Sequence, residues 1–354
     1  MVAMDMPRLA GDRRRRGQML AVLLGLAVLV VAVLSMGHGA SGVSAVGVLS
    51  DWLAGREIAR ADRIIVLDIR LPRLLTGLLV GASLAVAGAV MQGLFRNPLA
   101  DPGLLGVSAG AGFGAIAAIV LGGMLPAAIA ALTGWYLVPL AAFLCGWITM
   151  LALYAIATRQ GRTSIATMLL AGIAIAAMVG AASGLIVYYA NDAQLRDLTF
   201  WSMGSLAGSS WIKLAAAGPV MALSLIAAPC LARALNGLAL GEAAAAHVGI
   251  RVERAKTAAM LTTAGAVGAA VAVSGGIGFV GIVVPHLLRL ICGPDHRWLL
   301  VNSALLGARV LVLADMVSRT AIAPAELPIG IITAIMGGPF FTWVLLSNRK
   351  MLDG

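Results

Sequence analysis

Long apolar stretches separated by short polar segments run through almost the whole chain. Ten of these stretches approach or exceed the roughly 20 residues that carry a helix across a bilayer. They cover about 18–36, 66–94, 103–123, 136–157, 165–189, 211–232, 257–274, 277–292, 298–318 and 327–346. The pattern predicts an all-α polytopic membrane protein of about ten transmembrane helices, organised as a single transmembrane domain over residues 1–354.

Positive charge is distributed unevenly between the two sides of this predicted bundle. Sixteen lysines and arginines lie in segments on the side of the N-terminus, including a basic tail over residues 1–17, and eight lie on the opposite side. Cytoplasmic segments carry the excess of such residues, so the bias predicts cytoplasmic N- and C-termini. The net charge of +10 is explained by this topology, and no nucleic-acid partner is expected.

The composition supports a membrane protein and narrows the chemistry. The chain is 61% hydrophobic and 11% charged, with a mean hydropathy of +0.99, which is too apolar for a water-soluble core. Its three cysteines lie within or at the end of apolar stretches without metal-ligand spacing, so neither a disulfide nor a metal site is expected. His286 follows Pro285 in one stretch, and packing is its expected role because no second ligand is spaced to join it.

The segment Ile69–Gly114 contains a helix, a proline-rich turn and a second helix. Arg70 and Arg73 bracket Pro72 at a spacing that places both arginines on one side of a first helical turn. An uncharged stretch follows, and two Pro-containing dipeptides at 97–98 and 101–102 end it because proline cannot continue a helix. Glycines at 106, 110 and 114 then open the next stretch with a smooth face for a neighbouring helix.

The longest inner loop, at about 234–256, is predicted to contain a short helix. The alanine run after Gly241 favours helix, Glu242 lies at its positive end, His247 lies near its negative end, and Gly249 can terminate it. One interpretation is a solvated connector. The other is a docking helix for a cytoplasmic partner, with Leu240, Ala244 and Val248 on one face.

The chain contains no phosphate-binding G-x-x-x-x-G-K-[ST] loop, since none of its lysines follows a glycine. Uphill transport would therefore need a partner ATPase or an ion gradient. Ion coupling usually leaves acidic or histidine pairs near mid-membrane, and here only Asp315 and Arg309 stand out. Asp315 and Arg319 are one helical turn apart, which favours an ion pair near the outer end.

Together these segments resemble the permease subunits of ABC importers for iron-siderophore complexes, haem and cobalamin, over about residues 67–346. The resemblance is carried by Leu71-Pro72-Arg73, Val90-Met91-Gln92, Asn97-Pro98-Leu99-Ala100-Asp101-Pro102, Leu105-Gly106-Val107-Ser108, Trp201-Ser202-Met203-Gly204-Ser205-Leu206, Gly278-Phe279-Val280-Gly281, Val284-Pro285-His286 and Ala325-Glu326-Leu327-Pro328-Ile329-Gly330. It implies a bacterial inner-membrane homodimer that works with two cytoplasmic ATPase subunits and a periplasmic binding protein. ATP and Mg would be bound by the partner ATPase, and no cofactor by this chain.

The resemblance also implies roles for particular residues. Arg70, Arg73 and Arg319 resemble outer arginines that receive acidic residues of the binding protein, with anchoring of helix ends as the alternative. The loop resembles a coupling helix that contacts the ATPase, formed by Leu240, Gly241, Glu242, Ala243, Ala244, Ala245, Ala246, His247, Val248 and Gly249. The translocation path and gate are expected at Gly172, Ala176, Gly180, Trp201, Met203 and Gly204.

The expected function is import of an iron complex by alternating access, without covalent chemistry on this chain. The segment Asp192–Trp201 is most similar to haem-importing members, which makes haem the expected substrate, with ferric siderophores and cobalamin as alternatives. An ion-coupled carrier and a membrane scaffold without transport are the rival classes. Arg309 departs from the family pattern, in which a small or apolar residue is expected.

Overall fold

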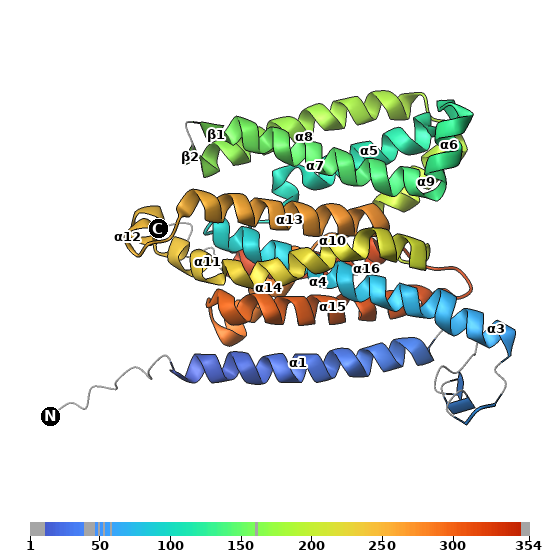
Figure 1. The fold of residues 1–354 in the computed structure, drawn as a ribbon, viewed down its shortest axis with the longest axis horizontal. Coiled ribbons are helices and arrows are strands. Elements are labelled where there is room, and N and C mark those ends of the chain that lie inside the picture. The colour runs from blue at the N-terminus through green and yellow to red at the C-terminus, as the bar shows by residue number, and fades with distance from the viewer. Residues whose placement is uncertain are drawn as a thin grey trace.

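The computed structural model describes residues 11–38, 47–48, 50–51, 54–56, 59–159 and 162–347, and so leaves the first ten residues of the predicted basic tail outside the described part. Its helices lie roughly parallel in one bundle (Figure 1). Within the described ranges, eight helices are long and apolar enough to cross a membrane, and two shorter apolar helices cover Val280–Cys292 and Ile329–Val344. The prediction of about ten spans is confirmed.

The helices follow the order of the apolar stretches. The longer ones are α1 (Gly11–Gly37), α4 (Leu71–Leu94), α5 (Val107–Leu121), α7 (Leu137–Ala157), α8 (Ile165–Tyr188), α10 (Trp211–Ala227), α13 (Val252–Ser274), α14 (Val280–Cys292), α15 (His296–Thr320) and α16 (Ile329–Ser347). The shorter ones are α3 (Arg60–Arg63), α6 (Ala127–Thr133), α9 (Asp192–Ser202), α11 (Ala232–Ala239) and α12 (Glu242–His247). A two-residue antiparallel pair, β1 (Thr158–Arg159) and β2 (Arg162–Thr163), joins α7 to α8.

Several irregular turns extend or link these helices. The π-helical segment η1 (Ile64–Arg70) continues α3 into α4, so that this helix starts before the predicted boundary at about 66. The 3-10 turn η5 (Ala228–Leu231) likewise joins α10 to α11. The other 3-10 turns are η2 (Pro102–Leu105), η3 (Gly122–Met124) and η4 (Gly134–Tyr136). Residues 124–135, which connect two predicted spans, contain α6.

Helices α4 and α13 form the centre of the bundle, where 83% and 78% of their most apolar windows are buried. Glycines allow α4 to approach its neighbours at backbone distance. A Cβ atom at Gly88 would collide with the Gly281 carbonyl oxygen of α14, and one at Gly81 with the Gly307 carbonyl oxygen of α15. Larger residues at these positions would push α4 away from α14 and α15.

Helix α8 lies at the edge of the bundle, beyond α5 and α7 (Figure 1). The expected smooth glycine face of α5 is confirmed, because a Cβ atom at Gly114 would lie 2.2 Å from the Ala141 oxygen of α7. In contrast, only 11% of the most apolar window of α8 is buried, with Leu170, Ile173 and Met178 largely exposed. Most of α8 is therefore uncovered in the single chain.

The two ends of the bundle carry different elements. Helix α1 begins at the end where α11, α12 and the β1–β2 pair lie, whereas α3, α6 and α9 lie at the opposite end (Figure 1). Helix α16 starts at this second end, since the Ile329 amide donates to the Gly204 carbonyl just after α9. The start of α1 and the end of α16 thus share one end, as an even number of spans requires. We name the α12 end inner and the α9 end outer, following the charge bias.

Candidate functional site

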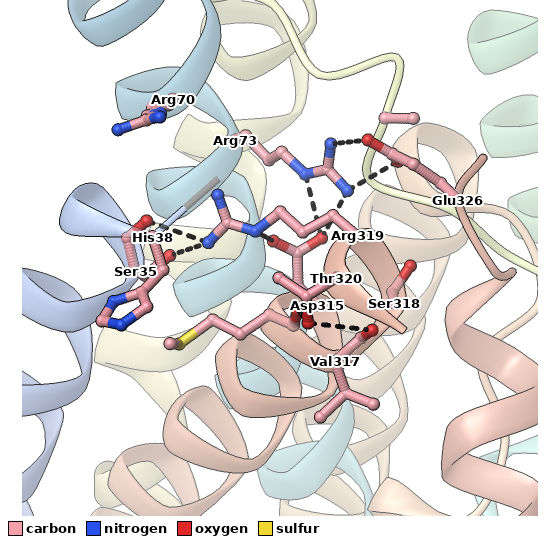
Figure 2. A network of polar contacts seen from close by, with 12 residues as sticks. Ser35, His38, Arg70, Arg73, Asp315, Val317, Ser318, Arg319, Thr320 and Glu326 are labelled. Atoms are coloured by element: carbon pink, nitrogen blue, oxygen red, sulfur yellow. Dashed lines mark hydrogen bonds and ion pairs between the residues drawn. The ribbon is translucent and has the colours of Figure 1, made fainter. Parts of the chain in front are cut away.

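The three predicted arginines meet at the outer end of the bundle (Figure 2). Arg70 is the last residue of η1, and Arg73 lies in the first turn of α4, where Pro72 is well placed because the first helical amides need no intrahelical partner. Arg319 lies in the last turn of α15. All three are buried, with exposed fractions of 5%, 7% and 7%. Each guanidinium therefore has to find its partners within the protein.

Arg73 bridges two carboxylates that come from separate segments. Its Nε and Nη2 atoms lie 2.9 and 2.8 Å from Oδ1 of Asp315 on α15. Its Nη1 and Nη2 atoms lie 2.8 Å from the two carboxylate oxygens of Glu326, in the connection before α16. A guanidinium has five N–H groups, and these contacts use four of them. Arg73 thus holds both acids at once, with Glu326 in a two-pronged pair.

Arg319 and Arg70 connect this cluster to the end of α1. The Nη2 atom of Arg319 donates to the carbonyl and hydroxyl oxygens of Ser35, at 2.9 and 2.7 Å. Nη1 of Arg70 donates to the Met36 carbonyl at 2.6 Å. The predicted ion pair between Arg319 and Asp315 is confirmed, with Nε to Oδ2 at 3.5 Å, although Arg73 is the closer partner of that acid.

We name Arg73, Asp315, Arg319 and Glu326 the outer network. Within it Asp315 is buried, with 4% of its side chain exposed, while 35% of the Glu326 side chain is exposed. The hydrogen bonds from Arg73 hold the pKa of Glu326 below its usual range. The sequence places Glu326 in a family motif but assigns it no role, since no local pattern ties it to an arginine 253 positions away.

Trp201, Met203 and Gly204, predicted at the gate, form a turn that the neighbouring segments hold by backbone hydrogen bonds. An Asn191–Gln194 capping box starts α9, which ends at Ser202. The Gly330 amide then donates to the Met203 carbonyl at 2.9 Å, and the Ile329 amide to the Gly204 carbonyl at 3.0 Å. We name residues 201–204 the gate turn.

Gly204 has the left-handed φ of +71°, and a Cβ atom there would lie 2.6 Å from the Gly276 carbonyl oxygen. Only glycine fits this backbone and this approach without strain. Beside the turn lies a cavity of about 360 Å³ whose wall includes Trp201 and two residues of the quoted motifs, Asp101 and Ser108. Asp101 is a site candidate that sequence reasoning missed, and its position in the Asp101-Pro102 turn was the available signal.

The remaining predicted path residues lie elsewhere, on α8. Gly172 is buried, whereas a Cβ atom at Gly180 would have no described atom within 4 Å. Ala176 lies between them and is half-buried. Within one chain these three residues and the gate turn do not form a common site. They stay predicted path residues, and of the three only Gly180 is left open by the described part of the single chain.

A short helix, α12, lies at the inner end where the sequence predicts the coupling helix, and its limits follow from its glycines. Gly241 precedes it with φ of +105°, and Gly249 follows with φ of +80°. Ala245 is fully buried, and Ala244 is half-buried. Apolar side chains that flank the helix point outward, with Leu240 76% and Val248 60% exposed. Ala243, Ala246 and His247 are also exposed.

A buried lysine connects α12 to the rest of the inner end. Lys256 on α13 is 2% exposed, and its Nζ atom lies 2.9 Å from Oε2 of Glu242, 3.2 Å from Oε1 of Glu253 and 2.8 Å from the Thr163 carbonyl. Glu253 also accepts from the Thr163 amide at 2.9 Å. We name Lys256, Glu242 and Glu253 the inner network; it joins α12, α13 and the turn before α8.

Two further residues that the sequence singles out, His286 and Arg309, do not belong to either network. The His286 ring packs edge-on against Phe340 at 5.7 Å, in line with a packing role. The Nε atom of Arg309 is buried and has no hydrogen-bond partner among the described residues. No group of three histidine, cysteine or acidic side chains that could hold a metal ion occurs within the described ranges.

Parallel membrane-length helices, a buried arginine cluster at one end and a short helix flanked by exposed apolar side chains at the other are the features of a multi-pass membrane protein. A model of the FecCD transport family matches residues 21–347, and the chain belongs to this family. It is a multi-pass protein of the bacterial inner membrane.

Relatives of known name cover almost the whole chain. The hemin transport system permease protein HmuU of Yersinia pestis is 43% identical over 333 residues, 94% of this chain and 98% of the relative. The vitamin B12 import system permease protein BtuC of Salmonella typhi is 43% identical over 347 residues, 96% of this chain and 99% of the relative. A solved structure of an inward-facing conformation, from a transporter assigned to the metal-chelate ABC type, matches with a TM-score of 0.81 at 31% identity, covering 93% of this chain and 99% of that one.

Proposed function

We propose that this chain is the translocating subunit of an ATP-driven importer whose substrate is haem. The observation that carries the proposal is the 43% identity to a hemin permease along 98% of that relative's length. Haem passes through a path between permease subunits, and ATP is hydrolysed on a separate subunit that also binds the Mg. This chain binds no cofactor and makes or breaks no covalent bond of the substrate.

The inner end is the proposed docking surface for the ATPase. Leu240 and Val248 expose large apolar side chains at the end assigned to the cytoplasm, where lipid does not cover them. Burial of such surface favours association. The inner network then links α12 to the β1–β2 turn and so to α8. Closure of the ATPase dimer would pull α12 and move α8 through Lys256.

The uncovered side of α8 is the proposed contact with a second copy of the chain. Gly180 is open on this side, and Ala176, one helical turn before it, is half-buried; small residues at this spacing let a neighbouring helix approach closely. A homodimer would cover the exposed apolar side chains of α8 and place the two copies around one path. In that arrangement the residues of α8 and the gate turn would line the same route.

The outer network is the proposed docking site for a periplasmic binding protein that delivers haem. Complementary charge steers encounter and fixes orientation, and its effect falls with salt. The buried position of the three arginines means that acidic residues of the partner must reach into the outer end to meet them. Docking would then act directly beside the gate turn.

The test is ATP-dependent haem uptake into proteoliposomes that contain this chain and its cognate ATPase, with and without the binding protein. Uptake that needs both ATP and the binding protein is the expected result. Cobalamin is the second candidate substrate, because a cobalamin permease is also 43% identical. Uptake of cobalamin without uptake of haem would replace the substrate and keep the mechanism, whereas ATP-independent uptake under a proton gradient would contradict the importer.

A further inference from the structure

The contacts within the outer network limit how many N–H groups of Arg73 are free to bind a further carboxylate. A partner carboxylate that binds Arg73 in a two-pronged pair needs two N–H groups on one edge of the guanidinium. Four of the five N–H groups of Arg73 already serve Asp315 and Glu326, and the edge formed by Nη1 and Nη2 is occupied by Glu326. An incoming carboxylate therefore cannot pair with Arg73 in this way while Glu326 stays in place.

Of the two acids on Arg73, Glu326 is the one that can leave. Asp315 is held inside α15, its side chain is 4% exposed, and Arg319 lies on its other oxygen. Glu326 belongs to the connection between α15 and α16, and 35% of its side chain is exposed. Figure 2 shows it approaching Arg73 from the side opposite to α1 and Ser35. Water and a partner can reach Glu326 from outside, whereas Asp315 is enclosed.

The segment that follows Glu326 reaches the gate turn directly. Leu327 is bonded to α15, since its amide donates to the Ser318 carbonyl at 3.0 Å and its own carbonyl accepts from the Ser318 hydroxyl. The amides of Ile329 and Gly330 then donate to the carbonyls of Gly204 and Met203. Only two residues separate Glu326 from the first of these bonds to the gate turn. Its ion pair with Arg73, together with the Ser318–Leu327 hydrogen bonds, holds the segment that we define as the strap, residues 326–330.

We propose that Glu326 is a displaceable internal ligand: a carboxylate of the docking partner replaces it on Arg73, and its release loosens the strap that holds the gate turn. This proposal rests on the function proposed above and adds to it the residue that transmits docking. The exchange conserves charge at Arg73, because one carboxylate leaves as another arrives. The network therefore stays neutralised while the strap moves, and Asp315 keeps Arg73 in place throughout.

Glu326→Gln tests the link between this ion pair and the gate turn without any partner. Glutamine keeps the shape of the side chain and removes the charge. Hydrogen exchange of the full chain in lipid nanodiscs should show the amides of Leu327, Ile329 and Gly330 exchanging roughly tenfold faster, as expected when a charged hydrogen-bonded pair is lost. Asp68→Asn is the matched control, since Asp68 is exposed on η1, near Arg70 in sequence, and outside the network. Unchanged exchange in Glu326→Gln, or an equal change in Asp68→Asn, would overturn the link.

Binding of the haem-loaded periplasmic protein to the same nanodiscs tests displacement. Glu326→Gln lacks the competing carboxylate, so its Kd for the binding protein should be several-fold lower than that of Asp68→Asn. Uptake by Glu326→Gln should nevertheless fall, because docking no longer moves the strap. A Kd equal to that of the wild type would refute displacement. Failure of the wild-type chain itself to bind would instead contradict the proposed docking partner, and the exchange experiment would still decide the link between Glu326 and the gate turn.

Discussion

The outer and inner networks share one arrangement, a buried cation between two carboxylates, although the outer network adds a second arginine, Arg319. Each places one buried cation between two carboxylates from different segments. At the outer end, one carboxylate is enclosed and the other is part-exposed, with 4% and 35% of the Asp315 and Glu326 side chains accessible. At the inner end both are part-exposed, with 42% for Glu242 and 36% for Glu253. The outer network therefore has one fixed acid, Asp315, and one movable acid, Glu326. In the inner network both acids can move, and Lys256 is the one buried member.

The choice of cation fits this difference. Arginine has five N–H groups in a rigid plane, so Arg73 can hold Asp315 on one edge and exchange its ligand on the other. Lysine has three N–H groups on a flexible stem, and Lys256 has three acceptors within reach, on α12, α13 and the turn before α8. An arginine thus suits a site where partners change, and a lysine suits a site where three segments move together.

The largest effect is expected from Asp315→Asn, which removes the enclosed acid. Arg73 and Arg319 would then share their buried position with Glu326 alone as the charged partner. Loss of one member of a buried pair costs roughly 3–5 kcal/mol. The free energy of unfolding in detergent should fall by that amount, measured against Asp197→Asn on the exposed surface of α9. A loss below about 1 kcal/mol would mean that water solvates Arg73 and Arg319 in place of Asp315. The stability of the outer network would then depend on its acids no more than that of the inner network does.

A smaller effect is expected from Lys256→Met, which removes the cation of the inner network. Glu242 and Glu253 can turn toward water, so the loss should be about 1–2 kcal/mol, close to that of ordinary hydrogen bonds. The amides of α12 should exchange faster, and transport per ATP hydrolysed should fall while ATPase binding through Leu240 and Val248 persists. Lys256→Arg keeps the charge and should retain part of the coupling. Full coupling in Lys256→Met would exclude the lysine as the link between α12 and α8.

The sequence predicts the membrane spans and the bounds of α12, but it does not predict the partners of Arg73. Apolar length predicts the spans because burial of twenty residues in lipid overrides local detail. Gly241 and Gly249 bound α12 correctly because their positive φ angles are local properties. The partner of Arg73 is not local: Asp315 lies 242 positions away, and packing of α4 against α15 selects it. The Asp315–Arg319 pair was found because one helical turn is a local spacing, but the closer partner of Asp315 was missed.

The predicted roles of the arginines show the same limit. A basic motif at an outer helix end suggests exposed charge that receives a partner, yet Arg70, Arg73 and Arg319 are all buried. Sequence alone gives the residue type and the side of the membrane, and docking at this cluster stays a prediction. It does not give the internal carboxylates that already occupy the site. Asp315 follows from the packing of α15 against α4, and Glu326 from the position of the connection before α16.

The smallest effect, and the one that separates the two acids of the outer network, is the pH dependence of Glu326. Arg73 lowers the pKa of this carboxyl from its ordinary value of 4.5, so the folded protein favours the ionised form. A lowered folded-state pKa contributes stability that is present above the unfolded pKa and is lost as the pH falls through the folded value. Because the side chain is part-exposed, we expect about 1 kcal/mol at neutral pH.

The measurement is the difference in unfolding free energy between the wild type and Glu326→Gln as a function of pH, which cancels the titration of the other acids. The difference should be constant from pH 7 down to about 5, should shrink as the pH falls below 4.5, and should vanish once Glu326 is protonated in the folded state. A difference that grows on acidification would mean that the folded state binds the extra proton. Glu326 would then be held in its neutral form, and a partner carboxylate would have no ionised ligand to displace from Arg73.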